Sequence, residues 1–411
     1  RRQRQMCIRD SYIEINFLDN NSFSGFFNRG DYDIAQITRQ ISAYFGKPII
    51  DGQTLLFFDE VQSCPEAIES LRFFYEKRPD LHIIASGSLL EFALTQLPSF
   101  GVGRIENLFM YPVNYCEYLL AIGQQQLLDE LFRVNLKAGC PELFHRTFLK
   151  HYKNFLLVGG LPEAVAEFAN SGDLLKTSQL VENLLVNYED DFKKYASKVP
   201  VDRLREVWRS ASLQAGKKFI HKHAFLDADS RQVQQTLNLL VMAGIVHKVY
   251  HSDGNGPPLG AEVDLKKFKT LPLDSGIYLQ LTGLRFAELA LLDPADLINK
   301  GALIEVHCGL EMLAYSKPTS RAGLNYWHRE AKNSNAEVDY LISVQGKIIP
   351  IEVKASTRGA MHSMHQFLKA KNASLGIRVS AQNFGWHNRI MMVPFYALSQ
   401  IERLVSSLGD L

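Results

Sequence analysis

The 411-residue sequence contains no apolar run that approaches the roughly 20 residues needed to cross a bilayer. Its five cysteines are widely spaced and form no Cys-x-x-Cys pair, which argues against disulfides and structural zinc and favours free thiols. The charges nearly cancel, with 45 basic and 44 acidic residues, so the surface as a whole is not strongly basic. We therefore expect a cytoplasmic protein with no membrane partner, in which any DNA contact comes from a local patch.

A buried strand that ends in two carboxylates is the most informative feature present. The apolar run 55–58 leads directly into Asp59 and Glu60. Open α/β sheets bind ligands at the carboxyl ends of their strands, and a strand of this kind is the Walker B element of P-loop ATPases. Asp59 would then hold Mg²⁺, and Glu60 would orient the attacking water. The alternative is a solvated strand end.

A second strand favours the nucleotide interpretation. After an amphipathic segment that starts at Pro65, the chain reads as a strand over 81–85, followed by Ser86 and Ser88. The two strands of a βαβ unit are parallel, so these serines should emerge at the same edge as Asp59. A polar sensor of the γ-phosphate would lie there. The alternative is that the serines only form a turn after a core strand.

The loop that should precede a Walker B strand is missing. No Gly-x-x-x-x-Gly-Lys-Ser/Thr occurs anywhere in the sequence. Residues 1–11 have no periodicity, and we interpret them as a candidate non-native scar. The remainder then reads as a fragment that begins just after the phosphate-binding loop.

Four segments follow the candidate scar. The predicted fold class is α/β: a P-loop-type parallel sheet core without its Walker A strand and loop (12–118), a helical lid (119–200), a winged helix-turn-helix (201–284) and a restriction-endonuclease-like α/β domain (285–411).

The winged-helix prediction depends on the order of its elements. Ser230 can cap a helix, Gly244 then provides a turn into an alternating strand, and a Gly/Pro-rich loop spans 253–260. The exposed face of the helix offers side chains that can read base edges or contact phosphates: Arg231, Gln232, Gln234, Gln235 and Asn238. The alternatives are a solvated polar face and a spacer that contacts protein.

A β-hairpin in the last segment carries a second set of carboxylates. If Gln345 and Gly346 form a two-residue loop, the pairing that starts there sets Asp339 opposite Glu352. It also sets Glu337 opposite Lys354, on the same face. Opposed carboxylates repel one another unless positive charge lies between them. A divalent metal and a lysine would supply that charge.

Asp followed one strand later by Glu-x-Lys is the layout of PD-(D/E)XK nucleases. Asp339 and Glu352 would hold Mg²⁺ or Mn²⁺, and Lys354 would activate water or stabilise charge on the phosphate. Glu305, in the helical stretch 302–306, is the candidate third acidic metal ligand. The alternative is an exposed hairpin whose charges form surface pairs.

Short blocks along nearly the whole chain resemble the AAA-type ATP-binding proteins of bacteria and archaea. These proteins join an ATPase core and a winged helix to a C-terminal domain of unknown function (DUF4143) with a restriction-endonuclease-like fold. The blocks are Phe57–Gln62, Ala85–Phe92, Val102–Ile105, Gly159–Ala164, Phe268–Lys269 with Leu273–Gly276, and Glu337–Asp339 with Ile351–Lys354.

The resemblance implies binding of ATP and Mg²⁺, with Ser86 or Ser88 as the sensor and Arg104 as a candidate phosphate-sensing arginine. We expect an ATP-dependent, DNA-associated protein that hydrolyses ATP in its full-length form and has a nuclease-like domain. Homo-oligomers are compatible with this expectation. The alternative is a non-enzymatic, nucleotide-dependent regulator or an interaction module with a degenerate active site.

Overall fold

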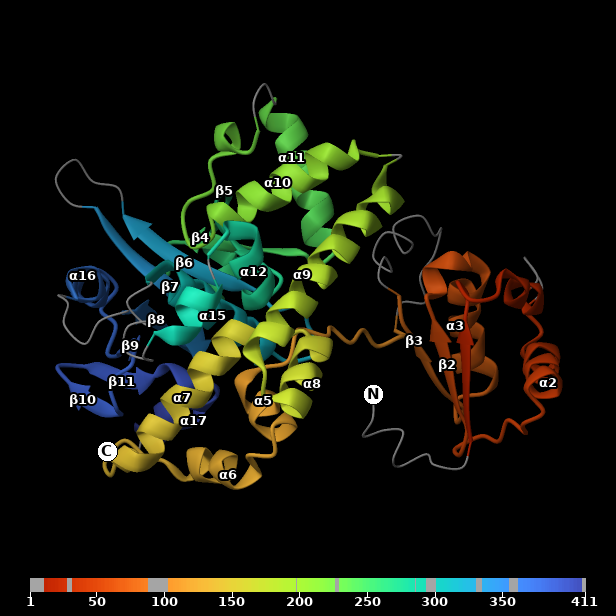
Figure 1. Cartoon of the computed structure of the whole chain (residues 1–411), viewed down its shortest axis with the longest axis horizontal. Helices are drawn as coiled ribbons and strands as arrows, with labels where there is room; N and C mark the ends of the chain where they lie inside the picture. The colour runs from red at the N-terminus through yellow and green to blue at the C-terminus, as the bar shows by residue number, and fades with distance from the viewer. Residues whose placement is uncertain are drawn as a thin grey trace. The chain divides into compact units, whose positions relative to one another are not determined.

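The computed structural model divides the chain into two compact units, residues 1–108 and 109–411. The described residues are 11–27, 32–87, 103–196, 198–225, 229–284, 286–292, 301–329, 335–354 and 361–408. The first unit has a parallel sheet with helices, and the second has a larger mixed sheet packed with helices (Figure 1). Within those ranges, no helix is both long and apolar enough to span a bilayer.

Three parallel strands form the sheet of the first unit, in the order β1 (Tyr12–Asn16), β2 (Leu55–Asp59) and β3 (His82–Ala85). The apolar run makes β2 the central strand, and its first four residues are buried. Helix α3 (Pro65–Lys77) connects β2 to β3, so the predicted parallel βαβ unit is confirmed. Proline suits the first helical position because an N–H there would have no partner within the helix.

Helix α2 (Ile34–Phe45) and two short 3₁₀ segments, η1 (Asn21–Phe26) and η2 (Val61–Ser63), complete the described part of this unit. Asp33 caps α2 because its side chain accepts hydrogen bonds from the backbone N–H groups of Ala35 and Gln36. The apolar face of α2 is buried in one hydrophobic cluster with β1 and with Phe58 of β2. The helix therefore contributes to the core of the first unit.

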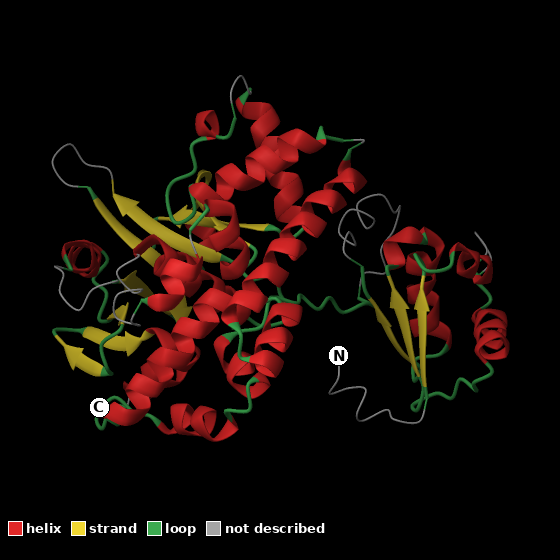
Figure 2. Cartoon of the chain, in the orientation of Figure 1, coloured by secondary structure: helices red, strands yellow, loops and turns green. Residues whose placement is uncertain are grey.

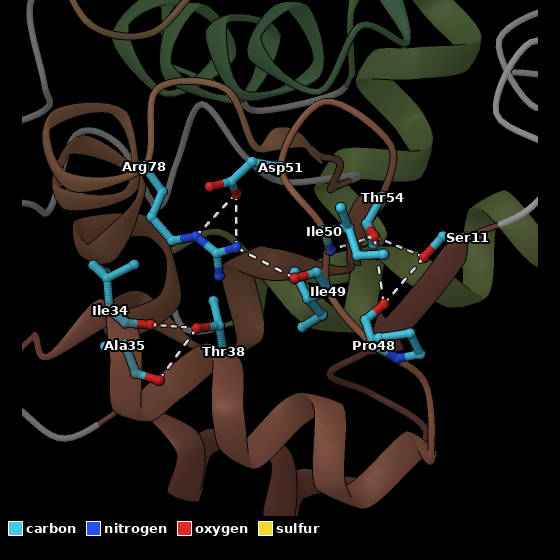
Figure 3. A network of polar contacts seen from close by, with 10 residues as sticks. All are labelled: Ser11, Ile34, Ala35, Thr38, Pro48, Ile49, Ile50, Asp51, Thr54 and Arg78. Carbon is cyan, nitrogen blue, oxygen red and sulfur yellow. Dashed lines mark hydrogen bonds and ion pairs between the residues drawn. The ribbon is translucent and has the colours of Figure 1, made fainter.

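A polar network fixes the amino ends of the strands (Figure 3). Ser11 precedes β1 and Thr54 precedes β2, and their hydroxyl oxygens lie 2.7 Å apart. Thr54 Oγ1 also accepts a hydrogen bond from the backbone N–H of Ile50 at 2.8 Å. Arg78, which follows α3, pairs with Asp51 at 2.7 Å. These contacts fix the amino ends of the strands, and Asp59 lies at the opposite, carboxyl end.

Helices account for most of the second unit before its sheet begins. They are α5 (Tyr115–Ala121), α6 (Gln125–Arg133), α7 (Glu142–Val158), α8 (Pro162–Ser171), α9 (Leu174–Asp191), η3 (Phe192–Tyr195), α10 (Val201–Leu213), η4 (His221–His223) and α11 (Ser230–Met242). Paired glycines at 159–160 separate α7 from α8. Asp229, and not the predicted Ser230, is the N-cap of α11, because its carboxylate accepts from the backbone N–H of Arg231.

Later helices alternate with strands. They are η5 (Leu259–Glu262), α12 (Ser275–Thr282), α13 (Phe286–Leu291), α15 (Gly301–Ala314), α16 (His362–Ala370), η6 (Phe395–Gln400) and α17 (Ile401–Ser407). The ring of Phe148 in α7 stacks on Tyr396 of η6, with centroids 4.6 Å apart. Tyr152 of α7 stacks on Phe395 in the same way, at 5.9 Å. Residues of the segment predicted as a lid thus share a core with the C-terminal residues.

One eight-stranded sheet runs through the second unit, in the order β10-β11-β9-β8-β7-β6-β4-β5. Figure 2 draws its strands in yellow among the helices of this unit. The strands are β4 (Val246–Ser252), β5 (Val263–Pro272), β6 (Leu324–Arg329), β7 (Ala336–Val344), β8 (Lys347–Val353), β9 (Gly376–Ser380), β10 (Gly385–His387) and β11 (Ile390–Pro394). Strand β4 pairs in parallel with β6, through Val249 and Leu324. The strands of the predicted winged helix therefore belong to the same sheet as those of the predicted nuclease-like domain.

Candidate functional sites

The acidic end of β2 meets the polar end of β3 in the first unit. Asp59 is the last residue of β2, and Ser86 follows β3 directly. Ser86 Oγ donates a hydrogen bond of 2.5 Å to Asp59 Oδ1. Backbone hydrogen bonds hold the two chain segments in this position, from Ser86 N–H to the carbonyl of Phe58 and from Val61 N–H to the carbonyl of Ser86. The structure thus brings Asp59 and Ser86 together at the carboxyl edge of the sheet.

Glu60 adopts an uncommon backbone conformation next to this pair. Its φ is 51°, in the left-handed region that non-glycine residues rarely adopt. Gln62 Nε2 donates a hydrogen bond of 2.6 Å to Glu60 Oε2. Gly87 makes room for Gln62, because a Cβ at that position would lie 2.1 Å from Gln62 Oε1. Such strained conformations are concentrated at functional sites.

Two further residues were predicted to contact the nucleotide, Ser88 and Arg104. Ser88 lies outside the described residues. Arg104 pairs with Glu76 at 2.6 Å, in the last turn of α3, whereas Asp59 precedes the first turn of that helix. Because α3 has 13 residues and rises 1.5 Å per residue, it is about 20 Å long. Arg104 is therefore at the opposite end of α3 from the acidic strand end.

The side chains described at the carboxyl ends of β2 and β3 suit magnesium. They include no lysine or arginine that could bind phosphate. Carboxylate and hydroxyl oxygens, such as those of Asp59 and Ser86, are the hard ligands that Mg²⁺ prefers. Across the described residues of the chain, however, no three His, Cys, Asp or Glu side chains are grouped so that they could hold an ion. The donors fit a magnesium ion that takes most of its remaining ligands from phosphate and water.

The hairpin of the second unit has the predicted register. Val344 pairs with Lys347 and Tyr340 with Ile351, around the loop Gln345–Gly346. Asp339 precedes this ladder directly, and its Oδ2 accepts a hydrogen bond of 2.8 Å from the backbone N–H of Val353. Glu352 precedes Val353 on the neighbouring strand. Asp339 and Glu352 therefore lie on adjacent strands, each one residue beyond the pair Tyr340 and Ile351.

Burial and charge control these two carboxyl groups. Glu352 is 3% exposed, and its Oε1 lies 2.5 Å from Lys354 Nζ. Its Oε2 is buried without a hydrogen-bond partner among the described residues. Burial raises the pKa of Asp339 well above its usual range, and the negative charge of Glu305 raises it further. Asp339 therefore keeps its proton to a higher pH than an exposed aspartate does.

A lysine that the sequence analysis did not assign lies within the same cluster. Lys269 of β5 is 1% exposed, and its Nζ is 3.1 Å from Glu305 Oε1. It forms a second ion pair with Glu337 of β7. Burial by itself would lower the pKa of Lys269, but the charges of Glu305, Asp339 and Glu337 outweigh burial and raise it. Glu305 lies in α15 as predicted, but its partner is a lysine.

The signal for Lys269 is present in the sequence. The residue lies in the otherwise uncharged run Phe268–Pro272, all of which is buried. A lysine that is buried on both sides along a strand needs a charged partner, because an unpaired buried ammonium is very costly. The sequence does not reveal which carboxylates pair with it.

Comparison with known families assigns three parts of the chain. A model of the AAA domain family matches residues 4–119. Two models of domains of unknown function match 149–288 (DUF8612) and 300–398 (DUF4143). No curated protein and no solved structure matches the chain.

The chain thus contains an AAA domain and a DUF4143 domain, as the resemblance implies. An AAA domain indicates a nucleotide-binding function of the ATPase type, which usually depends on Mg²⁺. The winged helix, the nuclease-like fold and DNA as a partner stay predictions.

Proposed function

We propose that the first unit carries out the magnesium-dependent nucleotide chemistry of an AAA-type ATPase. The observation that supports this most directly is the hydrogen bond from Ser86 to Asp59 at the carboxyl edge of the sheet. Asp59 would hold Mg²⁺, which neutralises phosphate charge when nucleotide is bound. Ser86 would orient this carboxylate, and Ser86 or Ser88 would sense the terminal phosphate.

Glu60 is the candidate for orienting the attacking water. Its carboxylate accepts a hydrogen bond from Gln62, which restricts the side chain. A restrained carboxylate next to the metal ligand Asp59 can accept a hydrogen bond from water and hold it in line with a phosphoryl group. The sequence contains no Walker A motif, so the test below supplies the lysine and N–H groups that cradle phosphates in an added segment.

ATP turnover by a Glu60→Gln variant tests this function. We would compare it with the unsubstituted protein, each joined to an upstream segment that carries a phosphate-binding loop. We expect Glu60→Gln to keep Mg²⁺-dependent nucleotide binding and to lose about 10²-fold or more in turnover. Glu76→Gln is the matched control, because it makes the same charge change at the far end of α3. Equal turnover in all three proteins would contradict the role of Glu60.

The alternative from a different class is a non-enzymatic regulator that changes conformation on binding nucleotide. It shares the binding site but needs no water-orienting residue. In that case the unsubstituted protein binds nucleotide and has no turnover for Glu60→Gln to remove. The same assay therefore separates the two functions.

A second candidate function is metal-dependent cleavage of DNA at the carboxylates of β7 and β8. The specific observation that favours it is the buried Oε2 of Glu352, which has no partner among the described residues. Four carboxyl groups (Glu305, Glu337, Asp339 and Glu352) are grouped with two ammonium groups (Lys269 and Lys354). When all four carboxyl groups are ionised, two negative charges are left over. One divalent cation at Asp339 and Glu352 would balance them.

Plasmid nicking in Mg²⁺ or Mn²⁺ tests this candidate. Under the nuclease hypothesis, Glu352→Gln removes a metal ligand, and Lys354→Ala removes the cation beside it, so both variants lose nicking. Lys369→Ala, which changes an exposed lysine in the last turn of α16, should nick like the unsubstituted protein. The same background in all four proteins would exclude the nuclease and leave a structural cluster.

A further inference from the structure

We propose that Lys269 is a built-in cation of the acidic cluster: its ammonium group occupies the position between Glu305 and Glu337 that a divalent metal would otherwise take. These two carboxylates are then structural partners of a lysine and not metal ligands. The inference goes beyond the proposed function, and it holds whether or not Asp339 and Glu352 bind a metal.

The position of the ammonium group is the first argument. Lys269 Nζ has both Glu305 and Glu337 as ion-pair partners and is almost completely shielded from water. It also lies 5.1 Å from the centre of the Tyr326 ring, whose face attracts cations. A cation with two carboxylates and an aromatic face around it leaves no room for a metal at the same point.

The path of the side chain is the second argument. In the sheet, β4 and β6 lie between β5 and β7, so Lys269 reaches Glu337 across Tyr326 of β6. Lys269 belongs to the segment matched at 149–288, whereas both carboxylates belong to the segment matched at 300–398. The acidic cluster of the DUF4143 domain is therefore completed by a residue from the preceding segment.

The cost of burial is the third argument. A buried ammonium is tolerated only when charges and hydrogen bonds compensate it, and removing one partner of such a pair is strongly destabilising. Here the compensating carboxylates come from α15 and β7. The ion pairs of Lys269 therefore connect β5 with both of these elements. A metal ion could also neutralise these two carboxylates, but it would have to be bound from solution. The lysine is part of the chain.

Mn²⁺ titration, by calorimetry and by the paramagnetic signal of the free ion, tests the proposal. Lys269→Met removes the ammonium group and keeps the length of the side chain. We expect this variant to bind one more Mn²⁺ per chain than the unsubstituted protein, because Glu305 and Glu337 then lack a cation. The additional site should vanish in Lys269→Met combined with Glu305→Gln. Lys267→Met, two residues earlier and partly exposed, is the matched control and should add no site.

Two results would overturn the proposal. One is a folded Lys269→Met variant with the same Mn²⁺ stoichiometry as the unsubstituted protein. The other is loss of Mn²⁺ binding by the unsubstituted protein on Glu305→Gln alone, since Glu305 would then be a metal ligand. Failure of the nuclease hypothesis is seen separately, as Mn²⁺ binding that Glu352→Gln does not change.

Thermal denaturation keeps the proposal testable if Lys269→Met does not fold. In Glu305→Gln the lysine loses one partner, so we expect a lower melting temperature than that of the unsubstituted protein. The difference between the two melting temperatures should be the same in Mn²⁺ and in EDTA. If EDTA destabilises the unsubstituted protein and this effect disappears in Glu305→Gln, then Glu305 holds a metal and the proposal is wrong.

Discussion

The carboxylate of Asp274 accepts a hydrogen bond of 2.5 Å from the backbone N–H of Gly160, which lies 114 residues earlier in the chain. Gly160 leaves no room for a side chain, because a Cβ there would lie 2.3 Å from the carbonyl oxygen of Val113. Two of the sequence blocks that support the resemblance, 159–164 and 273–276, therefore meet at one buried contact. The glycines and the aspartate have a shared structural role.

Asp274→Ala should destabilise the second unit more than loss of an ordinary helix cap. Asp274 also accepts from the backbone N–H of Ile277, so the change leaves two buried donors without an acceptor. We expect the free energy of unfolding to fall by about 2–5 kcal/mol. All three tryptophans lie in the second unit, so their fluorescence during urea denaturation reports on it alone.

Asp173→Ala is the control for this measurement. Asp173 caps α9 in the same way, through two backbone N–H groups, but it is exposed. Its loss should cost about 1 kcal/mol. Equal losses in the two variants would mean that the buried contact to Gly160 contributes nothing beyond capping.

Gly346→Ala should weaken the hairpin that aligns Asp339 with Glu352. Gly346 has a φ of 73°, and an alanine in the left-handed region costs about 1–2 kcal/mol. Gly323 precedes β6, lies in open space and has no positive φ, so Gly323→Ala should change stability by less than about 0.5 kcal/mol. Urea denaturation of both variants measures the difference. A loop that tolerates both alanines equally would not have the backbone conformation described here.

Local patterns predicted the parts of the fold in which short-range rules decide the structure. The two-residue loop at 345–346 fixes the register of β7 and β8, because a strand pair leaving such a loop has only one alignment. The position of Ser86 beside Asp59 followed from the parallel direction of strands in a βαβ unit. In both cases the information lies within about 30 residues of sequence.

Long-range pairings were not available from the sequence. Lys269 is a visible anomaly in a buried strand, but its partners Glu305 and Glu337 come from elements 36 and 68 residues away. The parallel pairing of β4 with β6 likewise joins two segments that the sequence patterns separate at 284. Arg104 was assigned to the phosphate site because of its block, yet its ion pair is with Glu76.

Arg231→Ala tests the prediction that α11 contacts DNA. Arg231, Gln232 and Gln235 are exposed on α11, so they are accessible to a duplex. If Arg231 contacts a phosphate, Arg231→Ala should bind DNA several-fold more weakly. The negative slope of log K against log salt should become less steep by about 0.9 in this variant. Fluorescence anisotropy with a labelled duplex at several salt concentrations measures both quantities. Arg146→Ala, an exposed arginine on α7, is the control, and identical behaviour of the two variants would argue against α11 as the DNA contact.

A buried carboxyl group should make the second unit less stable as pH rises. Glu311 of α15 is 3% exposed, accepts hydrogen bonds from the backbone N–H of Tyr115, and lines a cavity of about 20 Å³ with His307. Burial raises the pKa of Glu311 from 4.5 to about 8. Burial also lowers the pKa of His307 to about 3, so that ring is neutral in the folded protein throughout this range.

The direction of the effect follows from proton binding. Between pH 4.5 and about 8 the folded protein keeps the Glu311 proton that the unfolded chain releases, so the free energy of unfolding falls with rising pH. The contribution of one proton is about 1.4 kcal/mol per pH unit. Glu311→Gln cannot titrate and should lose less stability than the unsubstituted protein between pH 5.5 and 7.5. Urea denaturation at both pH values measures this difference, with the exposed carboxyl change Glu142→Gln as control. Parallel pH dependence of Glu311→Gln and the unsubstituted protein would show that Glu311 is ionised in the folded state, with the backbone N–H of Tyr115 compensating its burial.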